Sequence, residues 1–183
     1  DIAKGKYIAF NDSDDVWHLN KLEKEITKLK ENNADVVFCK QFTFGNLRKI
    51  IIPKHFKEGF LEKRMLPIGF LLQGVLGKAE IFKHNLFNTE LPISQDFEIM
   101  LRIHQNYSIY CIDEPLFDYY IQKDSISIDN EKMAKDLEYI LIRNKNLIKK
   151  HSLYLEILAT QFLAHVSKIA DKQRKKELVN LIF

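Results

Sequence analysis

Residues 7–17 of this 183-residue chain read Tyr-Ile-Ala-Phe-Asn-Asp-Ser-Asp-Asp-Val-Trp, and they decide the expected fold. A short apolar run of strand-forming residues ends at Phe10. Three carboxylates follow within four positions, at Asp12, Asp14 and Asp15. In open α/β sheets, ligands bind in the crevice at the carboxyl ends of the strands, which is where this acidic turn would lie. We therefore expect an α/β fold with a ligand site at the turn.

A helix is expected directly after the turn, over residues 19–32. Apolar side chains recur there three or four positions apart, at Leu19, Leu22, Ile26 and Leu29. Lysine and glutamate residues occupy the positions around this stripe. The pattern predicts an amphipathic helix whose leucine and isoleucine side chains face the core and whose charged side chains face solvent.

The acidic turn is a candidate site for a divalent cation. Asp12 and Asp14 are two positions apart on a tight turn, so both side chains can converge on one ion, with Asp15 in support. Hard cations such as Mg²⁺ and Mn²⁺ take oxygen ligands, often one or two carboxylates together with substrate phosphate. A structural alternative stays open, because aspartate is also favoured in turns and at helix N-caps, and Asp15 could be such a cap.

The longer stretch from Lys4 to Glu23 resembles the central segment of family 2 glycosyltransferases of the bacterial type. Its signature here is Gly-x-Tyr-Ile-x-Phe-x-Asp-Ser-Asp-Asp-x-Trp, followed by Lys-Leu-Glu. Members of the family usually carry proline two residues after the tryptophan, where this chain has Leu19. The resemblance covers about residues 1–127. It implies a GT-A fold, an inverting enzyme, a nucleotide-sugar donor, and Mn²⁺ or Mg²⁺ bound by Asp12 and Asp14.

A second group of polar residues lies within residues 91–103. In the resembling family, a Glu-Asp pair stands at this place, and its aspartate is the general base that deprotonates the acceptor hydroxyl. The matching residue is Asp96, and Gln95 replaces the glutamate. The resemblance therefore implies Asp96 as the catalytic base and Gln95 on the acceptor side. A structural alternative stays open here too, because Ser94 is a good helix N-cap and acidic residues favour the first turn of a helix.

Two further site residues follow from the resemblance. The family often threads a loop toward the acceptor near residues 67–76, where Gly74 would permit a close backbone approach. The family also often carries an arginine and a histidine after the last strand, the histidine lying near metal or diphosphate. Tyr120 and Gln122 occupy those positions here, which leaves Gln122 as a candidate hydrogen-bond donor to phosphate.

Two regions are expected along the chain. Residues 1–129 would form the GT-A-type catalytic and acceptor portion, with part of a mixed sheet, and residues 130–183 would form a C-terminal helical region. The family has about half of its nucleotide-binding subdomain upstream of the segment that starts this chain. We therefore expect a fragment that lacks the N-terminal nucleotide-binding half and could be inactive by itself.

Composition indicates an ordinary globular protein, with a net charge of +3 and 46% apolar residues. No apolar run approaches the roughly 20 residues that span a bilayer. Residues 131–183 carry 11 Lys+Arg against 6 Asp+Glu, so these helices could contact an anionic membrane surface, or simply be solvated. Cys39 and Cys111 fit buried free thiols in a reducing compartment. We expect a cytoplasmic location, with the inner face of the membrane as a second one, and no nucleic-acid partner.

The expected function is transfer of a sugar from a nucleotide-sugar to a glycan or lipid-linked acceptor, in the synthesis of cell-surface polysaccharide. Two alternatives stay open. The strand followed by Asp-Ser-Asp-Asp-Val also resembles the nucleophile loop of haloacid-dehalogenase-like phosphatases, in which Asp12 would attack phosphorus. A non-catalytic interaction domain is the other.

Overall fold

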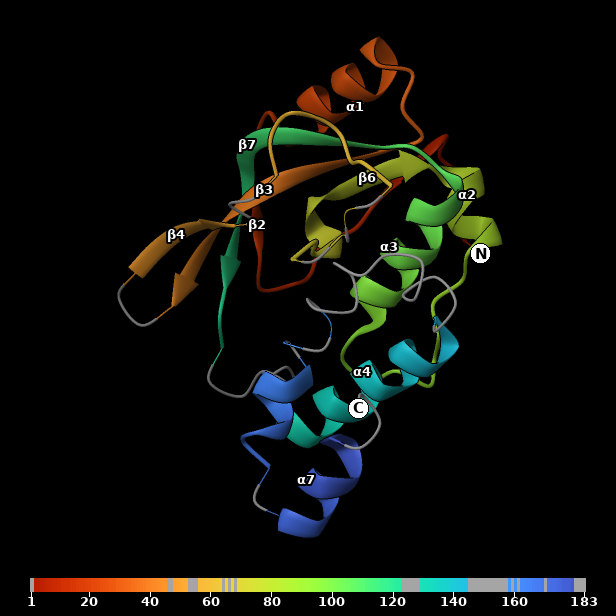
Figure 1. Cartoon of the computed structure of the whole chain (residues 1–183). Coiled ribbons are helices and arrows are strands. Elements are labelled where there is room, and N and C mark those ends of the chain that lie inside the picture. The colour runs from red at the N-terminus through yellow and green to blue at the C-terminus, as the bar shows by residue number, and fades with distance from the viewer. Residues whose placement is uncertain are drawn as a thin grey trace.

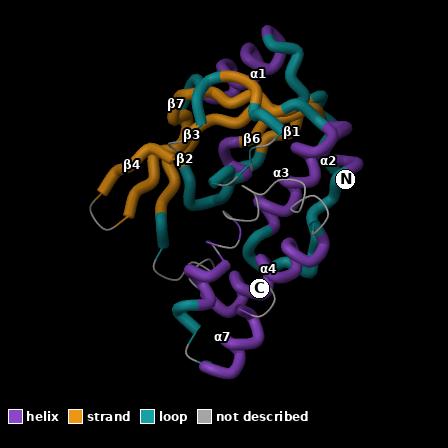
Figure 2. Tube along the Cα trace, viewed as in Figure 1, coloured by secondary structure: helices purple, strands orange, loops and turns teal. Residues whose placement is uncertain are grey.

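The computed structural model describes residues 2–45, 48–52, 56–63, 65, 67, 69–122, 129–144, 158, 160, 162–169 and 171–179. Helices are interspersed among the strands along the chain (Figures 1 and 2). The strands are β1 (Tyr7–Ala9), β2 (Val16–Trp17), β3 (Val36–Gly45), β4 (Arg48–Ile52), β5 (Gly59–Phe60), β6 (Val75–Lys78) and β7 (Ile109–Tyr120). The helices are α1 (Lys21–Glu31), the 3-10 turn η1 (Leu72–Gly74), α2 (Ala79–His84), α3 (Gln95–Asn106), α4 (Asn130–Arg143) and α7 (Lys172–Val179).

The described strands form one mixed seven-stranded sheet. Its main path runs β1-β6-β3-β7-β2, with β4 paired to β3 and β5 paired to β7. The long central strands β3 and β7 are parallel, with Val36 opposite Ile109, and the other pairs are antiparallel. The register shifts on both sides of Lys40, where β7 passes through Pro115. A parallel centre with antiparallel neighbours matches the predicted mixed sheet.

Helices cover both faces of this sheet. Successive residues of a strand point to opposite faces, and β3 shows this clearly. Val37 and Cys39 pack with Leu29 of α1 on one face. Val36 and Phe38 share a core cluster with residues of α2 and α3 on the other face. Figure 1 shows α1 above the sheet and α3 below it, so the fold has three layers with the sheet in the middle.

Several predicted elements are confirmed. The strand expected before the acidic turn is β1. Apolar runs at residues 34–44 and 49–52 predict a strand and its partner, and these are β3 and β4. Residues 78–84 predict a short helix, which is α2. The sequence also predicts two strands, at 107–112 and 116–122, separated by Asp113-Glu114-Pro115. The structure has one strand there, β7, which continues through the register shift. β6 was not predicted, since its residues lie in an apolar, glycine-containing run that we expected to be a loop.

The buried face of α1 differs from the prediction. Leu19 lies before the helix and is fully exposed, and Leu22 is 41% exposed. Lys21 and Glu25 are instead buried with Leu29, and both charged side chains are 0% exposed. The helix begins at Lys21, so its inner face follows positions 21, 25 and 29 and not the leucine stripe that starts at 19. The predicted orientation of the charged residues was therefore wrong at these two positions.

The C-terminal helix α4 packs beside α3. A third core cluster joins Leu91 and Leu101 to Ala134, Leu137 and Ile140 of α4, together with apolar residues from 158 to 169. Of the region 130–183, the segment 145–157 lies outside the described residues. The division at residue 130 stays a prediction. Within the part of the chain that the structure describes, no helix combines the length and apolar character needed to cross a membrane.

Candidate active site

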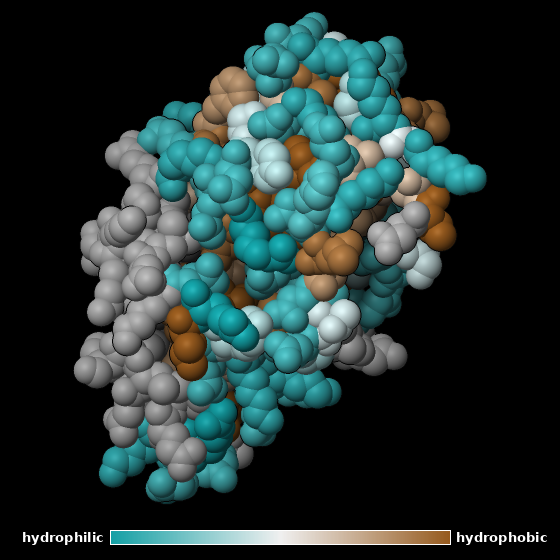
Figure 3. Space-filling view, turned by 90° about the vertical axis from the view of Figure 1, so that its right-hand side faces the viewer, coloured by the Kyte–Doolittle hydropathy of each residue, from teal (hydrophilic) through white to brown (hydrophobic). Residues whose placement is uncertain are grey.

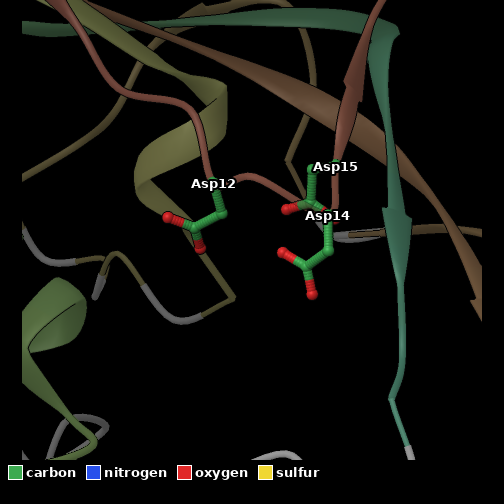
Figure 4. Close-up of side chains that lie close together, drawn as sticks. All are labelled: Asp12, Asp14 and Asp15. Carbon is green, nitrogen blue, oxygen red and sulfur yellow. The ribbon is translucent and has the colours of Figure 1, made fainter.

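The three carboxylates of the acidic turn converge at the end of β1 (Figure 4). Asp12, Asp14 and Asp15 each offer one carboxylate oxygen, and these oxygens lie within 4.8 Å of one another. The turn is closed by the Asp15 amide, which donates to the Asp12 carbonyl at 3.3 Å. Asp12 and Asp14 are exposed, whereas Asp15 is 7% exposed. The structure therefore brings together the three predicted metal-site residues, two of them open to a ligand.

The carboxylate of Asp15 is held by the last residue of strand β7. Its Oδ1 accepts the Tyr120 amide of β7 at 3.1 Å. Its Oδ2 is buried and has no hydrogen-bond partner among the described residues. Burial raises the pKa of the Asp15 carboxyl to about 6; the Tyr120 bond opposes this rise, the nearby charges of Asp14 and Asp12 add to it, and the Gln73 side chain lowers the pKa slightly. Asp15 is therefore no helix cap: α1 begins six residues later, and the carboxylate bonds to β7.

The acidic turn fits a hard divalent cation. Mg²⁺ and Mn²⁺ prefer oxygen ligands, and a cation would supply the missing partner for the buried Oδ2 of Asp15. A buried polar atom without a partner costs free energy, and a bound ion would recover it. Three close carboxylates also repel one another until a cation neutralises them. Asp12, Asp14 and Asp15 could therefore hold Mg²⁺ or Mn²⁺ between them.

Asp96 lies in the first turn of α3. Its Oδ2 accepts the Leu72 amide of η1 at 3.1 Å. Burial raises the pKa of Asp96 to about 6, the Leu72 bond opposes this effect, and the charge of Asp12 adds to it. A carboxyl group with a pKa near 6 is ionised at neutral pH and is a stronger base than an ordinary aspartate. The structure thus places Asp96 within the electrostatic field of the acidic turn.

Gln73 is a site residue that our sequence analysis missed. Its Nε2 donates a hydrogen bond to Oδ2 of Asp12. Its side chain is buried, at 4% exposure, and its Oε1 has no partner within the described part of the chain. The sequence does contain a feature that could have identified Gln73: it carries the one polar side chain in the otherwise apolar residues 67–77. Its neighbour Leu72 bonds to Asp96, so one short turn contacts both halves of the site.

Tyr119 is a second residue that the sequence did not single out. Its side chain is half-buried on β7. Burial raises its pKa, and the charges of four carboxylates raise it further, those of Asp15, Asp14, Asp12 and Asp96. Tyr119 packs against the core cluster that contains Leu29 of α1. A hydroxyl with a raised pKa stays protonated at neutral pH and can donate a hydrogen bond.

The remaining predicted site residues lie in different environments. Gly74 is buried, and a Cβ there would lie 2.8 Å from the Cys39 carbonyl of β3, so its close approach is to the protein's own sheet. Gln95 is half-buried and donates to the Leu91 carbonyl at 2.6 Å. Gln122 is exposed just after β7. The acceptor-side roles of Gly74 and Gln95 and the phosphate role of Gln122 stay predictions.

The fold and the site together indicate which class of ligand could bind here. A mixed sheet covered by helices on both faces carries an acidic turn at the end of a strand, with a further carboxylate facing it from α3. Such a site suits a ligand that brings its own negative charge to a cation, as a diphosphate does.

Comparisons with known proteins name the family. Residues 1–91 match the model of Glycosyl transferase family 2. The glycosyltransferase MJ1057 of Methanocaldococcus jannaschii is 29% identical over 157 residues, which are 82% of this chain and 54% of that protein. A UDP-Glc:alpha-D-GlcNAc-diphosphoundecaprenol beta-1,3-glucosyltransferase of Escherichia coli, WfgD, is 47% identical over 44 residues, 24% of this chain and 15% of that protein. Residues 1–91 therefore belong to a glycosyltransferase family 2 domain.

Solved structures agree on the fold. The structure of S. aureus TarS 1-349 in complex with UDP-GlcNAc matches 98% of this chain and 56% of its own, with a TM-score of 0.68 at 18% identity. The TarS complex with UDP gives a TM-score of 0.65. This likeness confirms the predicted GT-A-like α/β fold. The chain spans about half the length of the archaeal relative and of the TarS chain.

Proposed function

We propose that this chain carries the metal site and the acceptor half of an inverting, metal-dependent glycosyltransferase. The observation that supports it most is the bridge formed by η1, in which Gln73 bonds to Asp12 and Leu72 bonds to Asp96. Adjacent residues of one short turn thus hold the proposed metal ligand and the proposed base in fixed relation. The proposed reaction is that of the family, and the two contacts identify Asp12 and Asp96 as the residues proposed to carry it out.

The reaction assigns each carboxylate a role. Asp96 accepts the proton of the acceptor hydroxyl as that oxygen forms its bond to the anomeric carbon. The bond from that carbon to the diphosphate breaks, and the nucleoside diphosphate leaves with the bonding electrons. Attack from the face opposite the leaving group inverts the configuration. When bound at Asp12 and Asp14, the cation supplies Lewis-acid stabilisation of the leaving diphosphate. Asp15 holds the turn against β7 throughout.

A uridine nucleotide is the donor class that we propose. TarS binds UDP-GlcNAc and UDP in its structures, and the Escherichia coli relative is named for UDP-Glc and a diphosphoundecaprenol acceptor. A glycan or lipid-linked acceptor is proposed on the same basis. The phosphatase alternative, with Asp12 as nucleophile, gains no support, because the family match and the relatives named above are glycosyltransferases.

Contact with a membrane remains part of the proposal and would be electrostatic. On the face drawn in Figure 3, the described surface is mostly hydrophilic, and apolar side chains form small separate groups. In α7, Lys172 and Lys176 are exposed. Basic side chains of this kind are attracted to anionic lipid head groups. We place such contact at the inner face of the membrane, where a cytoplasmic enzyme would meet a lipid-linked acceptor.

Calorimetric titration of UDP and GDP into the full-length protein, with and without Mn²⁺, tests the metal half of the proposal. We expect UDP binding that requires Mn²⁺, and loss of that binding in Asp14→Ala because one metal ligand is removed. Glu80→Ala is the matched control, since it removes an exposed carboxylate from α2, away from the turn. Equal binding by Asp14→Ala and Glu80→Ala would refute the metal site.

Asp96→Asn in the full-length protein tests the base. A positioned base contributes about 10²–10⁴-fold to the rate, so sugar transfer should fall by that factor while Mn²⁺-dependent UDP binding is retained. Transfer is measured by release of UDP from the donor in the presence of acceptor. An unchanged rate in Asp96→Asn would exclude the residue as the base and leave the metal site standing.

A further inference from the structure

Asp136 is a buried carboxylate of α4 that reaches across to the start of α3. Its side chain is 2% exposed. One of its oxygens, Oδ2, accepts two backbone hydrogen bonds, from the amide of Ile93 at 2.9 Å and from the amide of Ser94 at 2.7 Å. These two amides belong to the last residues before α3. A helix outside the region matched by the family model therefore fixes the backbone that leads into the helix of Asp96.

From the sequence alone, Ser94 is the residue expected to cap the start of α3. Ser94 does occupy the N-cap position of α3, but its side chain makes no capping hydrogen bond. Its hydroxyl instead donates to Sδ of Met133, also in α4, at 3.2 Å. The entry to α3 is thus held by side chains of another helix and not by its own cap. Ser94 and Asp136 are both buried, so water does not replace these contacts.

The geometry points to Asp136 as a positioning residue for the carboxylate of Asp96, an inference that rests on the proposed function of Asp96. Asp96 follows Ser94 by two residues, and it reaches the Leu72 amide from the first turn of α3. The direction of that turn depends on the backbone at 93 and 94. By fixing both amides with one oxygen, Asp136 sets the path along which α3 begins and so aims Asp96 at η1 and the acidic turn.

Apolar packing alone would not give the same control. Leu91 and Leu101 contact the α4 cluster, and that burial holds α3 and α4 together. Hydrophobic contact is non-directional, so it tolerates small rotations and shifts of the helix. Hydrogen bonds at 2.7 and 2.9 Å to consecutive amides are directional and restrict the backbone there. A displacement of about 1 Å at a catalytic group can cost about 10²-fold in rate.

Three substitutions separate positioning from simple support of the fold. Asp136→Leu keeps the volume and removes the acceptor. Asp136→Asn keeps one oxygen, which can accept both amides, and should behave as the unchanged protein does. Asp129→Ala is the matched control: Asp129 also accepts two backbone amides with one oxygen, from Glu131 and Lys132 at 3.1 Å each, but it caps α4 and is far in sequence from α3.

The first readout is hydrogen exchange of the Leu72 amide, because that amide reports whether Asp96 is in place. We expect exchange at Leu72 to be about tenfold faster or more in Asp136→Leu, through easier local opening, and unchanged in Asp136→Asn and Asp129→Ala. Faster exchange at Ile93 and Ser94 without any change at Leu72 would show a local structural role and overturn the proposal. If Asp136→Leu does not fold, Asp136→Ala is measured in its place.

The second readout is turnover by the full-length protein. Asp136→Leu should lower kcat by about 10–100-fold with little change in the KM for donor, and Asp136→Asn should restore kcat. Equal kcat in Asp136→Leu and Asp129→Ala would also overturn the proposal. Absence of sugar transfer by the unsubstituted protein would refute the proposed function, whereas the exchange result at Leu72 would still decide whether Asp136 positions Asp96.

Discussion

Helices α1 and α3 each carry two oppositely charged side chains four residues apart, with the base first in α1 and the acid first in α3, and the two pairs differ in burial. In α1, Nζ of Lys21 lies 2.8 and 2.7 Å from the two carboxylate oxygens of Glu25, and both side chains are 0% exposed. In α3, Nε and Nη2 of Arg102 lie 2.7 and 2.9 Å from the oxygens of Glu98, and the Arg102 side chain is 33% exposed.

The difference lies in what each pair faces. The α1 pair is covered by Trp17, whose ring centroid lies 4.4 Å from Nζ of Lys21, and it lies against Cys39 of β3. Burial raises the pKa of Glu25 to about 7, although the charge and hydrogen bond of Lys21 oppose this rise. The attraction between the two buried charges roughly offsets the free energy lost when both leave water, so the pair adds little net stability.

Removing one partner of the buried pair should produce the largest effect. Lys21→Met leaves the Glu25 carboxylate buried and unpaired, and we expect it to lower the free energy of unfolding by about 3–5 kcal/mol at pH 8. Urea denaturation followed by circular dichroism measures this change.

The double variant Lys21→Met/Glu25→Leu is the control for that result. Both charges are then gone, so stability should return to within about 1 kcal/mol of the unsubstituted protein or exceed it. A double variant as unstable as Lys21→Met would show that the pair itself, and not the unpaired charge, supports α1.

An intermediate effect is expected from pH. The folded pKa of Glu25, about 7, lies above its ordinary value near 4.5, so the folded state holds a proton that the unfolded state has released. The contribution of Glu25 to stability is therefore full below about pH 4.5 and is lost as pH rises through about 7, by about 1–3 kcal/mol. Denaturation curves across this range, compared with those of Glu25→Gln, isolate the effect. An equal slope in the two proteins would contradict the raised pKa.

The smallest effect is expected at the partly exposed pair of α3. Arg102→Ala should lower the free energy of unfolding by about 1–2 kcal/mol, because solvent reaches the Arg102 side chain, although the buried Glu98 loses its partner. Thermal denaturation at low and high salt measures it, with a smaller effect at high salt. A loss as large as that of Lys21→Met would mean that the two pairs are equivalent after all.

These two helices also show how far the sequence predicts the fold. Periodicity predicted the first helix, the Ser94 cap position and the acidic residues after it predicted α3, and the strand formers predicted β1, β3 and β4. Periodicity could not tell which face of α1 is buried, because the leucines at 19 and 22 offered a plausible stripe and the lysine and glutamate did not. Trp17 of β2 and Cys39 of β3 shield Lys21 from solvent, and their positions are known only from the fold.

The candidate site was predictable to the extent that it is local in sequence. Asp12, Asp14 and Asp15 follow one strand, and the structure brings their oxygens together. Asp96 was implied by the family resemblance, and the structure adds its bond to Leu72. Gln73 and Asp136 were missed because they act across long sequence distances, to Asp12 and to residues 93–94. No spacing rule connects such residues before the fold is known.

The parallel pairing of β3 with β7 has a consequence for synthesis of the protein on the ribosome. Strand β7 follows β3 only after α2 and α3 have been made, and Asp15 obtains its backbone partner from Tyr120, at the very end of β7. Contacts between residues so far apart in sequence form slowly and late. During translation, the acidic turn therefore emerges long before the strand that anchors it, and the Asp15–Tyr120 contact forms only after residue 120 has left the exit tunnel.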